Sequence, residues 1–273
     1  MPSLEPSFVR LGRYARARSY LLSTLYFEAH QDLVMRLRRS GRIYRAMQIG
    51  PRTFQLDITD HSAIHEFFYG TAFRYEPLLT EHLLKRLTRG HVFVDVGANI
   101  GYFSVIAARL GARAIAFEPH PGPRRAMQEL AEKNAVEIEI IGSAVGMQAG
   151  QSGILHLASD SVLSTLDVTV AHERHTFTYD RTIAVPITSL DATLLTRPEL
   201  LSLQMLIKID VEGYEDRVVE GMLGLLEAVP SIEVVCETSP DTKADRQLRD
   251  MGLARTPLDL RASDFGNFLY RRA

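Results

Sequence analysis

The sequence predicts a Rossmann-like α/β fold, and three neighbouring features predict it. Residues Val92–Val96 form a short apolar, β-branched run, which is typical of a strand buried on both faces. Gly97 and Gly101 follow, and from Tyr102 onward the apolar side chains recur with helical spacing. A second apolar run, Ala114–Glu118, then ends in a carboxylate. A strand, a glycine turn, a helix and a second strand in this order begin a parallel sheet that binds nucleotides at its strand ends.

The glycine turn places backbone N–H groups at the start of a helix, where a ligand can approach the main chain closely. Asp95 stands one residue before the end of the strand and points to the same place. The dinucleotide pattern Gly-x-Gly-x-x-Gly is incomplete, because Ala98 and Asn99 follow Gly97 and the next glycine is Gly101. This gap disfavours a nicotinamide oxidoreductase, and the missing Gly-Lys-Ser/Thr ending excludes a P-loop. For these residues taken alone, an ordinary tight βα turn is the alternative.

Glu118 strengthens the nucleotide hypothesis. It lies 17 residues after Gly101, where an α/β nucleotide fold carries the acid that binds ribose hydroxyls. A carboxylate accepts hydrogen bonds from the 2′- and 3′-hydroxyls and repels a 2′-phosphate, so NADP is disfavoured. Pro119 prevents the strand from continuing.

Three motifs in this order resemble the FkbM family of S-adenosylmethionine-dependent methyltransferases. They are Phe-Val-Asp-Val-Gly-Ala-Asn-Ile-Gly-Tyr-Phe-Ser, Ala-Phe-Glu-Pro-His-Pro and Ile-Lys-Ile-Asp-Val-Glu-Gly-Tyr-Glu. Shorter pieces agree with the same family: Ile-Gly-Ser-Ala-Val-Gly at 141–146, Ser-Thr-Leu at 164–166 and Ile-Thr-Ser-Leu-Asp at 187–191. The resemblance covers about residues 90–240.

The resemblance implies a class I methyltransferase fold, with a mostly parallel seven-stranded sheet, an antiparallel last strand and helices on both faces. It implies S-adenosylmethionine as the cofactor and O-methylation of a hydroxyl on a secondary metabolite, sugar or glycolipid. In this fold the adenine lies beyond the third strand, expected at 138–141. The implied cofactor site consists of Asp95, Gly97, Asn99, Gly101, Tyr102, Glu118, Ser143 and Ala144.

Catalysis is expected at the end of the fourth strand, Met205–Asp210. Methyl transfer is a displacement at a carbon that a sulfonium already activates, so the protein must hold the acceptor in line and remove its proton. Asp210 and Glu212 are the candidate bases, with His120 and His175 behind them.

Lys208 is a charge inside a strand that should be buried, so it must be paired or neutral. It either forms a structural ion pair with Asp95, Asp210 or Glu237, or it orients the catalytic carboxylate. Glu237 ends the fifth strand and, with Asp210 and Glu212, offers three oxygens that could hold Mg²⁺. We predict no metal site, because these carboxylates can equally hydrogen-bond the acceptor.

Residues 1–74 are predicted to be an N-terminal extension, followed by a methyltransferase domain at 75–273. The extension is expected to contain helices at roughly 7–28 and 30–40, and then a β-hairpin at about 44–58.

The first helices are strongly basic. Nine arginines stand against Glu28 and Asp32, which gives residues 7–45 a local charge of +7. We predict a helical cap on the catalytic domain; contact with an anionic membrane surface or an acidic carrier or partner is the alternative.

Residues 150–188 depart from a plain alternation of strands and helices. Gly153–Leu157 and Ile183–Ile187 are predicted strands around a polar loop. We interpret this loop as a substrate-recognition element, because it places hydroxyls and imidazoles beside a cofactor site. Its histidines lack further ligands at useful spacing and do not indicate a metal. The polar residues are Ser164, Thr165, His172, Glu173 and His175.

Composition limits the remaining classes. A net charge of −2 and 46% apolar residues are typical of a soluble globular protein and give no nucleic-acid signature. The single cysteine, Cys236, lies in an apolar strand, which suits a reducing cytoplasm, and no signal peptide is evident. N- or carboxyl-methylation, and a non-catalytic cofactor-binding module docking through the basic helices, stay as alternatives. A homo-oligomer is compatible with the sequence.

Overall fold

The computed structural model describes residues 44–49, 52–57, 76–158, 164–167, 179–258 and 265–272. The chain divides into two compact units, Met1–Pro77 and Leu78–Ala273. In the first unit, β1 (Tyr44–Ile49) pairs antiparallel with β2 (Arg52–Asp57), which confirms the predicted hairpin. The predicted helices at 7–28 and 30–40 lie outside the described residues.

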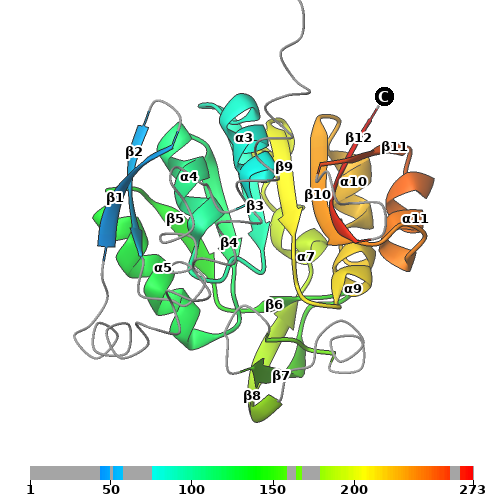
Figure 1. The fold of residues 1–273 in the computed structure, drawn as a ribbon. Coiled ribbons are helices and arrows are strands. Elements are labelled where there is room, and N and C mark those ends of the chain that lie inside the picture. Colours follow the sequence, from blue (N-terminus) through cyan, green and yellow to red (C-terminus); the bar gives the residue numbers. More distant parts are fainter. Residues whose placement is uncertain are drawn as a thin grey trace, which may run out of the picture. The chain divides into compact units, whose positions relative to one another are not determined.

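The second unit is built on a seven-stranded sheet (Figure 1). In spatial order its strands are β11, β12, β10, β9, β3, β4 and β5. Strand β12 is antiparallel to both neighbours, and the pairs from β10 to β5 are parallel, as predicted. The strand bounds are β3 (His91–Val96), β4 (Arg113–Phe117), β5 (Ile138–Ile141), β9 (Gln204–Ile209), β10 (Ile232–Thr238), β11 (Leu253–Pro257) and β12 (Gly266–Arg272).

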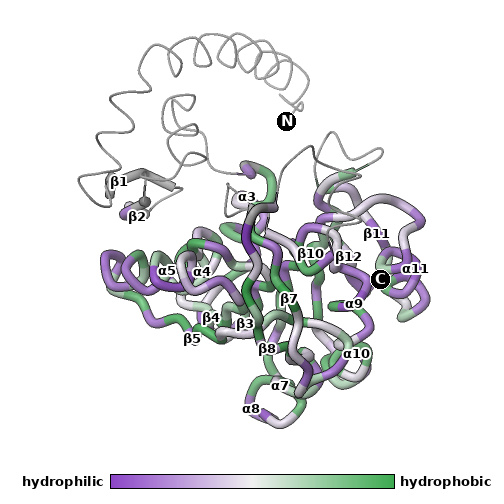
Figure 2. Tube along the Cα trace, turned by 90° about the horizontal axis from the view of Figure 1, so that it is seen from below, coloured by the Kyte–Doolittle hydropathy of each residue, from purple (hydrophilic) through white to green (hydrophobic). Residues whose placement is uncertain are grey.

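Strand β3 marks the topological switch point, because the chain proceeds from β3 to β4 and β5 on one side and continues with β9 on the other. Open α/β sheets bind ligands at such a point, beyond the carboxyl ends of the strands. Hydrophobic residues predominate along the central strands (Figure 2), because these strands are buried on both faces.

Helices cover both faces of this sheet. Because successive strand residues point to opposite sides, neighbouring residues of one strand contact different helices. On β4, Ile115 belongs to the apolar cluster that includes α7 to α10, whereas the next residue, Ala116, packs with Met127 of α5. On β9, the Lys208 ammonium lies 5.4 Å from the centroid of the Phe103 ring in α4. The helix bounds are α3 (Pro77–Arg86), α4 (Tyr102–Leu110), α5 (Pro121–Lys133), α7 (Leu190–Leu194), α8 (Pro198–Leu201), α9 (Glu215–Glu220), α10 (Leu223–Ala228) and α11 (Lys243–Asp250).

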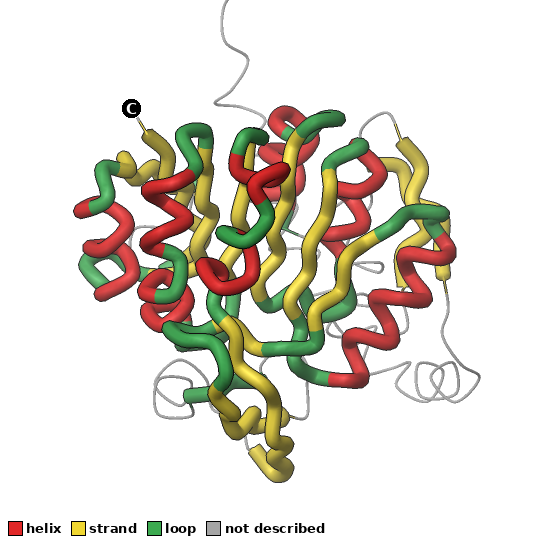
Figure 3. Tube along the Cα trace, turned by 180° about the vertical axis from the view of Figure 1, so that it is seen from behind, coloured by secondary structure: helices red, strands yellow, loops and turns green. Residues whose placement is uncertain are grey.

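A three-stranded sheet projects from one end of the main sheet (Figure 3). It contains β6 (Ala144–Val145), β7 (Gln151–Ala158) and β8 (Tyr179–Thr188), in the spatial order β6, β8, β7. The two predicted strands of residues 150–188 lie within β7 and β8. Strand β6 was not predicted, because two residues carry no periodicity, and neither was β11, an edge strand with mostly exposed residues.

A buried carboxylate joins the last strands to α11. Asp245 is fully buried and accepts hydrogen bonds from the Tyr270 hydroxyl at 2.8 Å and from Arg255 Nη1 at 3.0 Å. We predict that Tyr270→Phe lowers the free energy of unfolding by about 1.5–3 kcal/mol, because a buried charge loses a donor. Denaturant unfolding at constant m-value measures this. An unchanged midpoint would mean that Arg255 and Arg249, whose Nε lies 3.1 Å from Oδ2, satisfy Asp245 without the tyrosine.

Candidate active site

A pocket of about 570 Å³, counted with the part open to solvent, lies at the carboxyl ends of β3, β4 and β9. The main sheet supplies two turns to it, one after β3 and one after β9. Leu155 of β7, in the three-stranded sheet, also lines the pocket. Ser164 and Leu166 line it from the segment between β7 and β8. Seven predicted site residues line this pocket together: Gly97, Asn99, Glu118, Ser143, Ala144, Asp210 and Glu212.

The two glycine positions of the turn after β3 have no room for a side chain. Gly97 has a φ of +78°, and a Cβ at this position would lie 1.9 Å from the backbone oxygen of Asp210. Gly101 has a φ of +83°, and its Cβ would lie 2.3 Å from the Met127 side chain. Asn99, between them, is left-handed at a φ of +50°, and its Oδ1 has no hydrogen-bond partner among the described residues. The turn therefore offers a ligand Asn99 Oδ1 as a hydrogen-bond acceptor and, at its two glycines, lets the ligand approach the main chain closely.

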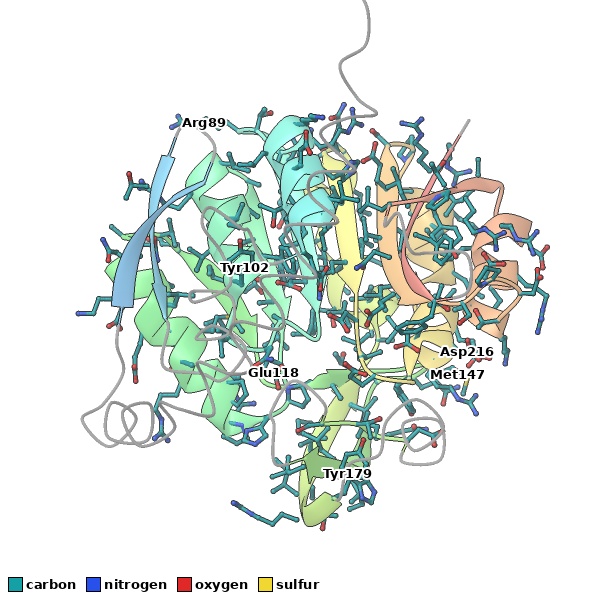
Figure 4. All side chains as sticks on the ribbon, in the orientation of Figure 1. Arg89, Tyr102, Glu118, Met147, Tyr179 and Asp216 are labelled. Atoms are coloured by element: carbon teal, nitrogen blue, oxygen red, sulfur yellow. The ribbon has the colours of Figure 1, made fainter. Side chains whose placement is uncertain are left out.

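Glu118 follows β4 and is only 7% exposed (Figure 4). Its Oε2 accepts a hydrogen bond from the Asn99 N–H at 2.9 Å, and its Oε1 accepts one from the His120 N–H at 2.7 Å. Burial raises the pKa of Glu118 to about 7, although these N–H groups and Arg124 oppose the shift. Each carboxylate oxygen keeps a lone pair for a ligand hydroxyl.

Four predicted site residues do not line the pocket: Asp95, Gly101, Tyr102 and Lys208. Asp95 is fully buried, and its Oδ2 accepts a hydrogen bond from the Ser104 hydroxyl at 2.6 Å. Burial raises the pKa of Asp95, and the Lys208 ammonium, 3.8 Å from Oδ1, opposes the shift. Tyr102 begins α4, and its ring meets the Phe103 ring edge-on, 5.0 Å between centroids. The expected ligand contacts of Asp95 and Lys208 are thus replaced by contacts within the protein, because both side chains are buried in the sheet.

The turn after β9 brings carboxylates together. Oxygens of Asp210, Glu212 and Glu237 all lie within 4.8 Å of one another, and each residue is half-buried. Lys208, in β9, donates to Asp210 Oδ2 at 2.9 Å, so the ion pair predicted for it is confirmed. Glu212 and Gly213 are both left-handed, with φ of +53° and +101°. Asp210 and Glu212 of this cluster line the pocket, and Glu237 does not.

Sequence reasoning missed Leu155, Leu166 and Tyr214, which also line the pocket. Leu155 belongs to β7, Leu166 lies between β7 and β8, and Tyr214 precedes α9. The predicted Ala144 lines the pocket as part of β6 and pairs with Ile187 of β8. The Ser-Thr-Leu motif at 164–166 is the sequence feature that could have indicated Leu166 as a pocket residue. His120, named above as a further candidate base, caps α5. Its Nδ1 accepts a hydrogen bond from the Gly122 N–H at 2.9 Å.

Several predictions concern residues outside the described ranges. These are residues 7–43 of the basic segment and the loop residues His172, Glu173 and His175, so their expected roles stay predictions. None of the described helices is long and apolar enough to cross a membrane.

Comparison with known proteins agrees with this geometry. The model of the methyltransferase FkbM domain matches residues 95–260, which contain both turns and Glu118. The tRNA (guanine(37)-N(1))-methyltransferase of Aedes aegypti is 30% identical over 100 residues, 34% of this chain and 18% of that protein. Its counterpart from Danio rerio is 30% identical over 106 residues, 37% of this chain and 22% of that protein. The chain thus matches about a fifth of the length of these relatives.

Two solved structures are examples of a more distant likeness. A 16S rRNA methyltransferase of T. thermophilus is 14% identical, with a TM-score of 0.47, over 85% of this chain and 51% of that chain. An rRNA methylase of Streptococcus thermophilus is 13% identical, with a TM-score of 0.42, over 75% of this chain and 100% of that chain. The fold assignment rests on the sheet described above and the family on the domain match. The chain belongs to the FkbM family of S-adenosylmethionine-dependent methyltransferases.

Proposed function

We propose that this protein is an O-methyltransferase that methylates a hydroxyl of a secondary metabolite, a sugar or a glycolipid. One observation carries the proposal: a buried ribose-type carboxylate, Glu118, and the paired bases Asp210 and Glu212 line one pocket. A sugar or alkyl hydroxyl has a high pKa, so a carboxylate at its oxygen favours O-methylation.

The residues present fit the cofactor. Glu118 offers two oxygens to the ribose hydroxyls, and Asn99 Oδ1 offers an acceptor without a partner. Gly97 keeps the space that a Cβ would fill, and Ser143 and Ala144 lie where the adenine edge is expected. S-adenosylmethionine supplies a methyl group on a positively charged sulfur and leaves as neutral S-adenosylhomocysteine.

On the acceptor side, Asp210 and Glu212 hold the hydroxyl and take its proton as the oxygen–methyl bond forms and the sulfur–methyl bond breaks. Lys208 donates to Oδ2 of Asp210 and thereby fixes the orientation of this carboxylate. In this proposal the other oxygen, Oδ1, takes the proton of the hydroxyl. The Gly97 backbone lies close to the Asp210 backbone. The turn proposed to bind the cofactor and the turn that carries the base therefore keep a fixed position relative to each other.

Calorimetric titration with S-adenosylhomocysteine, with NAD⁺ in parallel, tests the cofactor. We expect binding of S-adenosylhomocysteine alone. Methyl transfer from labelled S-adenosylmethionine to a panel of hydroxylated metabolites and sugars then tests the acceptor. A product whose methyl group is released by mild alkali would indicate a carboxyl-methyltransferase instead, and binding without any transfer would favour a non-catalytic module.

Methylation of an RNA base is the second candidate, because the matched relatives are tRNA (guanine(37)-N(1))-methyltransferases. Including transfer RNA in the same panel separates the two candidates. Label in RNA and in no hydroxylated small molecule would replace the O-methylation proposal.

We predict that chelation of divalent cations leaves turnover unchanged. A cation bound by Asp210 would meet the Lys208 ammonium, which already lies 2.9 Å from Oδ2, and like charges at this range repel. Turnover measured with EDTA and with added Mg²⁺ checks this. Loss of activity in EDTA that Mg²⁺ restores would show that Asp210, Glu212 and Glu237 hold a metal.

A further inference from the structure

The turn between β9 and α9 adopts a conformation that its own sequence does not favour. Glu212 is a non-glycine residue with a φ of +53°, and Gly213 after it has a φ of +101°. A non-glycine residue in the left-handed region is held there by its surroundings. Within the turn, the Gly213 N–H donates to Glu215 Oε1 at 3.0 Å. A second hydrogen bond comes from 47 residues away, from Thr165.

Thr165 is a buried residue, 1% exposed, that joins two parts of the fold. Its backbone N–H donates to the His156 carbonyl at 3.0 Å and its carbonyl accepts from the His156 N–H at 2.8 Å, which fixes it to β7. Its hydroxyl donates to the Glu212 carbonyl at 2.8 Å and accepts from the Asp167 N–H at 3.0 Å. One hydroxyl thus connects the three-stranded sheet to the carboxylate turn.

We propose that Thr165 is a positioning residue for methyl transfer: its hydroxyl holds the backbone of Glu212 and so aims the Glu212 carboxylate at the acceptor. The inference rests on the proposed function, in which Glu212 contacts the acceptor. The segment that carries Thr165 would then have two roles. It lines the pocket with Ser164 and Leu166, and it holds the Glu212 backbone.

Tyr179 is a probe for the Glu212 carboxylate, because it responds to the charge of Glu212. Burial raises the pKa of the Tyr179 phenol, and the nearby Glu212 carboxylate raises it further. Tyr179 begins β8 in the same small sheet (Figure 4). Its ring lies 6.4 Å, centroid to centroid, from the ring of His156, whose backbone holds Thr165. Tyr179 is therefore next to the residue that fixes Thr165 and close enough to Glu212 to respond to its charge.

The first test needs no acceptor. The ¹³Cζ resonance of Tyr179 is assigned with Tyr179→Phe and followed at neutral pH in the full-length protein. Glu212→Gln should move it, which validates the probe. Thr165→Val, which removes the hydroxyl at similar volume, should move it too, and Thr165→Ser should not. Thr193→Val is the matched control, because its hydroxyl donates to the Ser189 carbonyl at 2.9 Å outside the pocket.

The second test uses turnover with the acceptor found in the screen. Thr165→Val should lower kcat about tenfold with unchanged affinity for S-adenosylhomocysteine, and Thr165→Ser should restore it. In the Glu212→Gln background, Thr165→Val should have little further effect, since both changes remove one function. Thr193→Val should keep the wild-type kcat.

The outcomes separate the inference from the proposed function. If Thr165→Val leaves the Tyr179 resonance and kcat unchanged, or weakens only cofactor binding, the inference is wrong. If Thr193→Val lowers kcat equally, lost stability and not positioning explains the result. Should Thr165→Val not fold, Thr165→Ala replaces it. If no acceptor is ever methylated, the proposed function fails, and the resonance still decides whether Thr165 holds Glu212.

Discussion

Asp210→Asn is expected to bind S-adenosylhomocysteine normally and to lose turnover by a factor of about 10²–10⁴, the usual contribution of a positioned base. Asparagine keeps the size of aspartate but cannot take the acceptor proton. The buried Lys208 keeps a partner in this variant, because Asp95 lies 3.8 Å from its ammonium and the Phe103 ring lies beneath it. The loss should therefore reflect chemistry and not collapse of the fold. Single-turnover kinetics with labelled S-adenosylmethionine measure it.

Asp250→Asn serves as the matched control, because it makes the same change at an exposed residue that ends α11 and is not part of the pocket. It should keep the wild-type rate. Full activity of Asp210→Asn would end the general-base role of Asp210 and leave Glu212 as the remaining candidate on this turn.

Glu118→Ala is expected to weaken binding of S-adenosylhomocysteine by about 1–3 kcal/mol, or about 5- to 150-fold, from lost charge-assisted hydrogen bonds to the ribose. The substitution also leaves the N–H groups of Asn99 and His120 without their acceptor, so the glycine turn loses an anchor. Isothermal titration measures the change. Glu132→Ala, on the exposed side of α5, is the control, and unchanged affinity of Glu118→Ala would remove Glu118 from the site.

Because Glu118 has a raised pKa, we predict that cofactor binding depends on pH. Burial raises the pKa of Glu118 to about 7 in the ligand-free protein. Ribose hydroxyls donate to the ionised form, so the complex favours deprotonation and lowers this pKa. Affinity should therefore be full above pH 7 and fall as the pH drops below 7, approaching about tenfold per unit. In Glu118→Gln this dependence should disappear, and a wild-type slope in that variant would assign it to another group.

Local patterns in the sequence were sufficient for the central part of the fold. The apolar run of β3, the glycine turn and the carboxylate after β4 are short-range signals, because each depends on neighbouring residues that favour a buried strand or a positive φ. Their order indicated the family, and the seven-stranded sheet with its antiparallel last strand is confirmed. Among the described strands, the short β6 and the exposed edge strand β11 lacked such a signal.

Contacts between distant residues were decided by the tertiary structure. Asp95 and Lys208 are register partners on β3 and β9, and a shift of one residue would turn Lys208 to the opposite face. This register, which no local pattern specifies, buries Asp95 beneath the pocket and leaves Asp210 at its edge. The hydrogen bond from Thr165 to Glu212 likewise needs the three-stranded sheet to be in place. The sequence by itself determined which residues are candidates for the chemistry; the tertiary structure decided which of them line one pocket, because strand register and long-range packing set the direction of each side chain.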